Sequence, residues 1–133
     1  MQLFPITVIA TVFVVSAALA QDIDCSNPQV QLEMTFCAER DWQIADDDLN
    51  AAYKAAQGAM KAVDQSLAED QQGASLALRD AQRAWVDFRD AACAAEGYPS
   101  RGGSIEPMII YGCRARLTQT RADDLWSLSE DRQ

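Results

Sequence analysis

The sequence predicts an all-α protein, a three-helix up-down-up bundle tied by two disulfides. Apolar residues recur at spacings of three and four over most of the chain, which is typical of helices with one buried face. Residues 64–75 and 97–103 are rich in turn-forming residues and interrupt this pattern. No stretch alternates apolar and polar residues as a half-buried strand does, and four cysteines are present to tie the helices.

Residues 1–20 are predicted to be a secretory signal peptide that is cleaved. They carry no charged side chain, contain an apolar run over residues 6–15, and end in the small-x-small site Ala18-Leu19-Ala20. A membrane anchor is the alternative, but the run is shorter than the about 20 apolar residues that span a bilayer. Residues 21–133 are then expected to form a single α-helical domain of a soluble periplasmic or secreted protein, without a stable membrane anchor.

The first helix is predicted over residues 28–63, because Asn27 is a good N-cap and Pro28 suits the first helical position. The third helix is expected to begin at Ser104, which can cap it, with Pro107 tolerated in the first turn. Its inner face is predicted to contain Ile110, Cys113, Leu117, Arg121, Leu125 and Leu128.

The second helix is predicted to begin between Ser66 and Ser75 and to end near Glu96, before the helix-stopping Gly97. We expect the other helices to pack on the apolar stripe of its residues 78–93, which consists of Leu78, Ala81, Trp85, Phe88 and Ala92. The predicted structural core of the bundle contains Met34, Leu49, Trp85, Phe88 and Leu117.

The four cysteines are predicted to form two disulfides, because an even number in an exported chain is typical of oxidised pairs. A zinc site is disfavoured, since the chain has no histidine and no C-x-x-C pair. Counting residues along each helix places Cys37 level with Cys113, and Cys25 near Cys93. This favours the pairs Cys25–Cys93 and Cys37–Cys113, while Cys37–Cys93 with Cys25–Cys113 stays open as the alternative.

Few residues suggest catalysis. Without histidine the chain cannot form a Ser-His or Cys-His arrangement, and it has no glycine-rich phosphate loop. Asp46, Asp47 and Asp48 are consecutive, so on a helix their carboxylates point about 100° apart and do not form a catalytic pair. We therefore predict that the protein is not an enzyme and uses no metal and no cofactor.

Some polar residues are predicted to fix the register of the first two helices. If the turn lies near Leu67, residue n of one helix faces about residue 134 − n of the other. Asp46 is then expected to pair with Arg89, and Asn50 to meet Gln82 or Arg83. The alternative is that these are ordinary solvated side chains, which contribute little to stability.

The formal net charge of −9 indicates a basic protein partner and argues against nucleic acid. Solubility alone is the alternative reason for an acidic exported chain.

Four stretches and the region of the last cysteine form a recognisable pattern. They are Gln31-x-Glu33-Met34-x-x-Cys37-Ala38, Ala45-Asp46-x-x-Leu49-Asn50-x-x-Tyr53, Leu78-x-x-Ala81-Gln82-Arg83-Ala84-Trp85-x-x-Phe88-Arg89-Asp90-x-x-Cys93, Gly103-Ser104-x-x-Pro107, and Cys113 with Thr118 or Thr120, Arg121 and Leu125. In this order they resemble the LprI family of lysozyme inhibitors, which are small exported bacterial proteins. The resemblance covers nearly all of residues 21–133.

The resemblance implies a helical, disulfide-bonded domain of the cell envelope that binds and inhibits lysozyme-type muramidases. Lysozymes of the C type are basic, which agrees with the charge of this chain. The alternative function is that of an envelope module that docks to another envelope protein without inhibiting lysozyme.

Residues 98–103, YPSRGG, are the candidate inhibitory loop, because a protruding loop enters an enzyme cleft more easily than a helix face does. Arg101 can pair with a cleft carboxylate, Tyr98 supplies an aromatic anchor, and Ser100 lies between them. The alternative is that this segment only closes the helix end.

Overall fold

The computed structural model describes residues 23–130, which form an all-α, three-helix bundle, so the predicted fold class is confirmed. The predicted signal peptide lies outside the described residues. Among those described, no helix combines the length and the apolar content needed to cross a bilayer. The elements in chain order are α1 (Gln31–Ser66), η1 (Glu69–Gln71), α2 (Ala74–Gly97), η2 (Tyr98–Ser100) and α3 (Glu106–Glu130).

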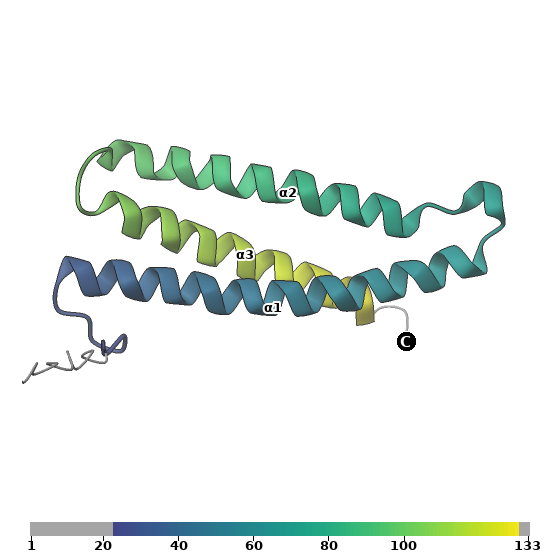
Figure 1. Cartoon of the computed structure of the whole chain (residues 1–133), viewed down its shortest axis with the longest axis horizontal. Helices are drawn as coiled ribbons and strands as arrows, with labels where there is room; N and C mark the ends of the chain where they lie inside the picture. The colour runs from purple at the N-terminus through teal and green to yellow at the C-terminus, as the bar shows by residue number, and fades with distance from the viewer. Residues whose placement is uncertain (1–22, 131–133) are drawn as a thin grey trace, which may run out of the picture.

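The longest helix, α1, packs mainly on α3, and α2 lies against both with a smaller interface (Figure 1). The hairpin of α1 and α2 extends beyond the C-terminal end of α3. Alanines at the centre of the α1–α3 interface allow the two backbones to approach closely. The buried core cluster consists of Leu49, Ala52, Ala56, Met60, Leu78, Ala122 and Leu125.

Two of the five predicted core residues are exposed. Leu49 is buried, and Trp85 and Leu117 are half-buried, but Phe88 is 59% and Met34 is 36% exposed. The buried stripe of α2 runs through Arg89 and Cys93, one position away from the predicted apolar stripe. Phe88 therefore faces outward. Met34 lies in the first turn of α1, at the end of the bundle, where neighbouring side chains leave it partly open.

The predicted cysteine pairing is wrong in both its favoured and its alternative form, because the disulfides are Cys25–Cys37 and Cys93–Cys113. The first helix begins at Gln31 instead of Pro28, since the Glu33 carboxylate accepts hydrogen bonds from the backbone N–H groups just before it. The preceding lead is thus free to turn back along α1 and bring Cys25 to Cys37 (Figure 1). The predicted pairing used only the height of each cysteine along its helix. It did not include the rotation of α2 and α3 about their axes, which makes Cys93 and Cys113 face each other.

Arg89 is the centre of contacts that join α2 to α1. Its side chain is only 8% exposed, and its guanidinium carbon lies 5.5 Å from the ring centroid of Trp42 and 5.4 Å from that of Trp85. Its Nη1 lies 3.5 Å from an oxygen of Asp46, and its Nε donates to Asp90 at 3.0 Å. The guanidinium therefore has carboxylate partners from two helices and aromatic faces from the same two.

Arg114 brings α3 into this cluster. Its guanidinium carbon lies 4.9 Å from the ring centroid of Trp42, and its Nε is 3.3 Å from the Asp90 oxygen that Arg89 also contacts. Tyr111 stacks on Trp42 with ring centroids 5.8 Å apart. The Trp42 indole of α1 is thus contacted by arginines of both other helices. We call the following residues the arginine–tryptophan cluster: Trp42, Asp46, Trp85, Arg89, Asp90, Tyr111 and Arg114.

The other predicted register contacts are replaced by different ones. Asn50 donates to Asp46 on its own helix at 3.3 Å and does not meet Gln82. Gln82 instead accepts a hydrogen bond from Arg121 of α3 at 3.0 Å, while Arg83 is exposed. The reason is that Gln82 lies on the buried stripe of α2, which faces α3 at this level.

The N-terminus of α2 is capped by a side chain of α1. Asp64 accepts hydrogen bonds from the backbone N–H groups of Gly73, Ala74 and Ser75 at 2.7–3.1 Å, and from the Ser75 hydroxyl at 2.8 Å. These bonds hold the pKa of the Asp64 carboxyl far below its usual range. One carboxylate thus satisfies the free donors of a helix and closes the α1–α2 turn.

We expect Asp64→Asn to lower the Tm at pH 7, because an amide supplies only one acceptor oxygen to these donors. A carboxylate whose pKa is lowered by folding stabilises the protein fully above its unfolded pKa of about 3.9, and this stabilisation is lost as pH falls below that value. The Tm difference from the parent should therefore shrink between about pH 4 and pH 2. Melting by circular dichroism measures this, with the exposed Asp70→Asn as control. A Tm gap that does not change with pH would contradict the capping role.

We expect Arg89→Ala to destabilise the protein by about 3 kcal/mol, because it removes a buried cation that contacts two indoles and two carboxylates. Arg83→Ala makes the same change at an exposed position of the same helix and should stay within about 0.5 kcal/mol of the parent. Urea unfolding of both variants measures the difference. Equal stabilities would mean that the arginine–tryptophan cluster does not hold α2 in place.

Candidate functional site

The candidate inhibitory loop lies at one end of the bundle, between α2 and α3. Tyr98 is 61% exposed, and the Arg101 guanidinium lies over its ring at 4.9 Å from the centroid. Arg101 is also 3.7 Å from a carboxylate oxygen of Glu106. Ser100 is half-buried, and its carbonyl accepts a hydrogen bond from the Gly103 N–H. Tyr98 and Arg101 are therefore one exposed unit, whereas Ser100 has a structural part in the turn.

The base of this loop is held by close packing and hydrogen bonds. Gly97 is buried, and a Cβ on it would lie 2.7 Å from the side chain of Ile110 on α3. Gly102 adopts a φ of 76°, which favours glycine, and its N–H donates to Glu106 at 2.6 Å. The disulfide Cys93–Cys113 joins α2 to α3 about one helical turn before Gly97. The contact made by Glu106 was not predicted from the sequence, although an acid in the first turn of a helix is a sign of such a contact.

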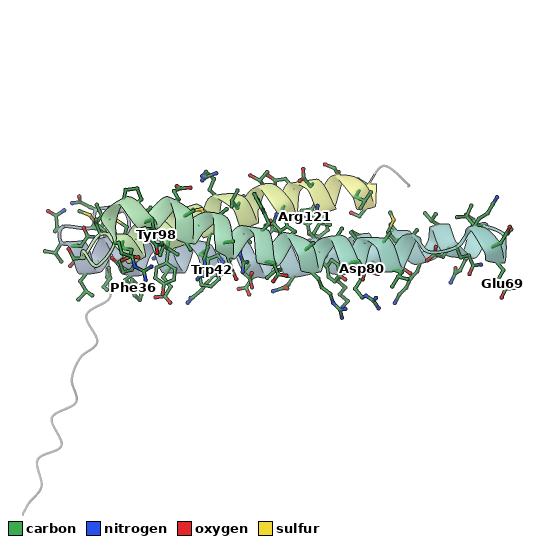
Figure 2. All side chains as sticks on the ribbon, turned by 90° about the horizontal axis from the view of Figure 1, so that it is seen from above. Phe36, Trp42, Glu69, Asp80, Tyr98 and Arg121 are labelled. Carbon is green, nitrogen blue, oxygen red and sulfur yellow. A yellow bond between two sulfur atoms is a disulfide. The ribbon has the colours of Figure 1, made fainter. Side chains whose placement is uncertain are left out.

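Exposed apolar side chains gather at the same end of the molecule. Figure 2 shows Phe36 and Tyr98 together at this end, opposite to Glu69 at the far turn. Phe36 is 45% exposed, and Leu32, one turn earlier on α1, is 77% exposed. The loop end of the bundle thus presents aromatic and aliphatic surface that the fold itself does not cover.

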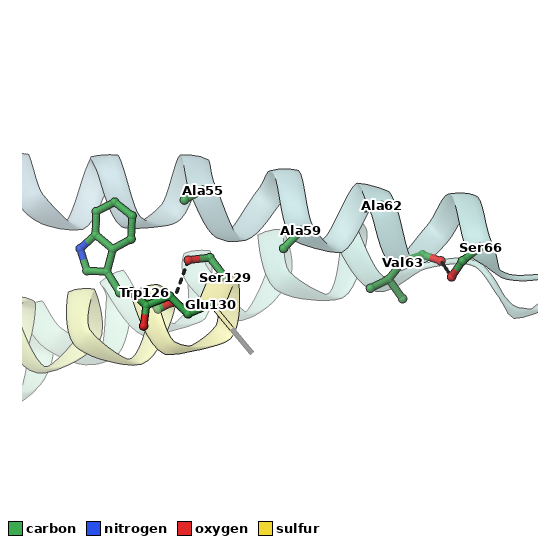
Figure 3. Close-up of a pocket in the computed structure, with 8 residues that line it drawn as sticks. All are labelled: Ala55, Ala59, Ala62, Val63, Ser66, Trp126, Ser129 and Glu130. Carbon is green, nitrogen blue, oxygen red and sulfur yellow. Dashed lines mark hydrogen bonds between the residues drawn. The ribbon is translucent and has the colours of Figure 1, made fainter. Parts of the chain in front are cut away.

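A groove of about 550 Å³ lies at the other end of α3, against α1 (Figure 3). Three alanines of α1, Val63 and Trp126 make up the apolar part of its walls. The hydroxyls of Ser66 and Ser129 both donate to carbonyls of their own helices at 2.7 Å, so their protons are already used within the fold. The groove has the apolar lining of a binding surface but no converging polar groups of the kind that an active site needs.

The acidic run at residues 46–48 has structural contacts. Asp46 contacts Arg89, and Asp48 accepts hydrogen bonds from Trp126 Nε1 at 3.0 Å and from Gln119 at 3.1 Å. Asp47 is exposed. Within residues 23–130, no group of three or more metal-ligating side chains comes together. The carboxylates of the run therefore serve different neighbours and do not converge on one point.

Comparison with known proteins gives one family and two informative relatives. The family model described as lysozyme inhibitor LprI matches residues 24–125. An uncharacterized protein of Rhizobium meliloti is 41% identical over 110 residues, which cover 80% of this chain and 79% of the relative.

The crystal structure of a DUF1311 family protein from Pseudomonas putida has a similar fold. Its TM-score is 0.63 at 25% identity, and the match covers 74% of this chain and 92% of that one. The family match extends from the lead before α1 to near the end of α3, and it includes all four cysteines and the arginine–tryptophan cluster. The chain therefore belongs to the LprI lysozyme inhibitor family.

Proposed function

We propose that this protein is an exported, periplasmic or secreted inhibitor of lysozyme-type muramidases that acts by binding and has no enzymatic activity of its own. The observation that carries the proposal is the family match over residues 24–125. The absence of histidine from the whole chain also agrees with a binding protein, since the commonest catalytic base is missing.

The charge of the chain supports a basic partner. Its formal net charge is −9, and complementary charge accelerates the encounter of two proteins and fixes their orientation. Such steering weakens as salt is added, because the Debye length falls to about 8 Å at physiological ionic strength. An inhibitor of this kind should therefore bind a basic lysozyme faster at low salt.

The loop end is the part of the molecule best suited to block a cleft. Glycosidase clefts are lined by two carboxylates, and an arginine can pair with a carboxylate through two parallel hydrogen bonds. In the free protein the Arg101 guanidinium lies over the Tyr98 ring and has one carboxylate contact, to Glu106 at 3.7 Å, so it can exchange this carboxylate for one in the cleft. The Arg101 side chain is 66% exposed, so a partner can reach it.

The alternative is a non-inhibitory envelope module that docks to another envelope protein. The exposed Leu32 and Phe36 favour this function, because contiguous apolar surface marks protein–protein contacts. The two functions differ in one measurement, which is the effect of the protein on cell-wall hydrolysis.

We expect purified residues 21–133 to slow hydrolysis of cell walls by a C-type lysozyme at low ionic strength, and to do so less at high salt. Turbidity of a cell-wall suspension measures the rate over a range of inhibitor concentrations. A rate that a large molar excess leaves unchanged at low salt would refute inhibition and favour the docking module.

We expect Arg101→Glu to raise the inhibition constant at least about tenfold. The change replaces the cation that pairs with a cleft carboxylate by an anion that the cleft carboxylates repel. Arg83→Glu carries the same charge change at an exposed site of α2 and is the matched control. Circular dichroism verifies that both variants keep their helices. If the two variants inhibit equally well, Arg101 is not part of the inhibitory surface.

A further inference from the structure

Phe88 has no evident structural task. It belongs to the stretch of α2 in which Trp85, Arg89 and Asp90 all contribute to the arginine–tryptophan cluster. Phe88 instead is 59% exposed in the middle of the helix. A phenylalanine side chain is more stable when it is buried than when water covers it, so a ring in this position suits a surface that a partner covers.

The surface around Phe88 is flat. At about 100° per residue, Ala81, Ala84, Ala91 and Ala95 lie within about 60° of Phe88 on the helix circumference. All four alanines are exposed. Trp85, which is half-buried, also lies about 60° from Phe88, and the other exposed residues of this face are alanines, so the Phe88 ring is the side chain that projects farthest toward a partner. We call Phe88 and the four alanines the outward face of α2.

The charges beside the outward face are negative. Asp80 and Asp87 are exposed and lie about 80° and 100° from Phe88 on one side. Of the exposed cations of α2, Arg79 lies about 180° from Phe88 and forms an ion pair with Asp80 at 3.0 Å, whereas Arg83 lies about 140° away, beyond Asp87 on the same side. The outward face thus combines an aromatic anchor with the exposed carboxylate of Asp87 in a chain of net charge −9, which matches a partner that carries positive charge.

The outward face also leads to the candidate inhibitory loop. Steps of three and four residues connect Phe88 to Ala91, Ala95 and Tyr98, and the backbone of Tyr98 is still helical. Phe88 and Tyr98 are ten residues apart, which corresponds to about 15 Å along the helix. A partner whose cleft receives Arg101 can therefore lie along α2 and reach Phe88.

We propose that the outward face of α2 docks the basic lysozyme, with Phe88 as the anchor that fixes the enzyme while the loop enters its cleft. This inference rests on the proposed function. A second copy of the chain is a poorer occupant, because both copies carry a net charge of −9 and repel each other.

Two variants and two matched controls test the docking face. Phe88→Ala removes the anchor, and its control is Ile44→Ala, an apolar side chain of α1 with the same exposed fraction of 59%. Ala84→Lys adds bulk and positive charge to the outward face, and its control is Ala51→Lys at an exposed alanine of α1. Lysozyme inhibition constants, binding by calorimetry, Tm and size-exclusion chromatography are measured for all five proteins.

We expect Phe88→Ala and Ala84→Lys to raise the inhibition constant about tenfold or more, while their Tm values and those of both controls stay near the parent's. Unchanged inhibition by the two variants, with a parent that does inhibit, overturns the docking face and leaves the proposed function intact. A parent that neither binds nor inhibits lysozyme overturns both. A collapse of the Tm in Phe88→Ala, or a dimer of the parent that this change dissociates, overturns the docking face by assigning Phe88 to the fold or to self-association.

Discussion

The burial of the Arg89 guanidinium is the constraint on which the rest of the structure depends. A cation with a side chain that is only 8% exposed requires both charge compensation and planar packing, and it finds these in Asp46, Asp90, Trp42 and Trp85. These groups come from α1 and α2, and Arg114 extends the contacts to α3. In a bundle whose core is rich in alanine, this cluster fixes the rotation and the level of all three helices at once.

The rotation of α2 decides what the protein presents to solvent. Because Arg89 and Cys93 face inward, the opposite side of the helix carries Phe88 and exposed alanines outward. The same rotation brings Cys93 to Cys113 and Gly97 to Ile110, so the loop between α2 and α3 is held at its base. The rotation of α2 thus determines both the contacts that stabilise the bundle and the residues that α2 exposes to solvent.

A protein that binds through such a surface has little conformational entropy to lose. The loop is closed by a disulfide and by the hydrogen bond from Gly102 to Glu106, and Arg101 already lies over Tyr98. Preorganised groups lose less freedom on association, which leaves more of the contact energy as affinity. Asp64 caps α2 at the opposite turn and keeps the hairpin closed there.

The three helices, their up-down-up order and the turn regions could be predicted from the sequence alone, because apolar spacing and turn residues act locally. It also predicted that Asp46 lies near Arg89, since equal rise on two antiparallel helices fixes axial level. Which residues face inward and which cysteines pair could be read only from the packed bundle. Rotation about a helix axis depends on the packing of all three helices together. Because Arg89 is buried, Phe88 lies on the surface and not in the predicted core, and because α1 starts at Gln31, Cys25 can reach Cys37.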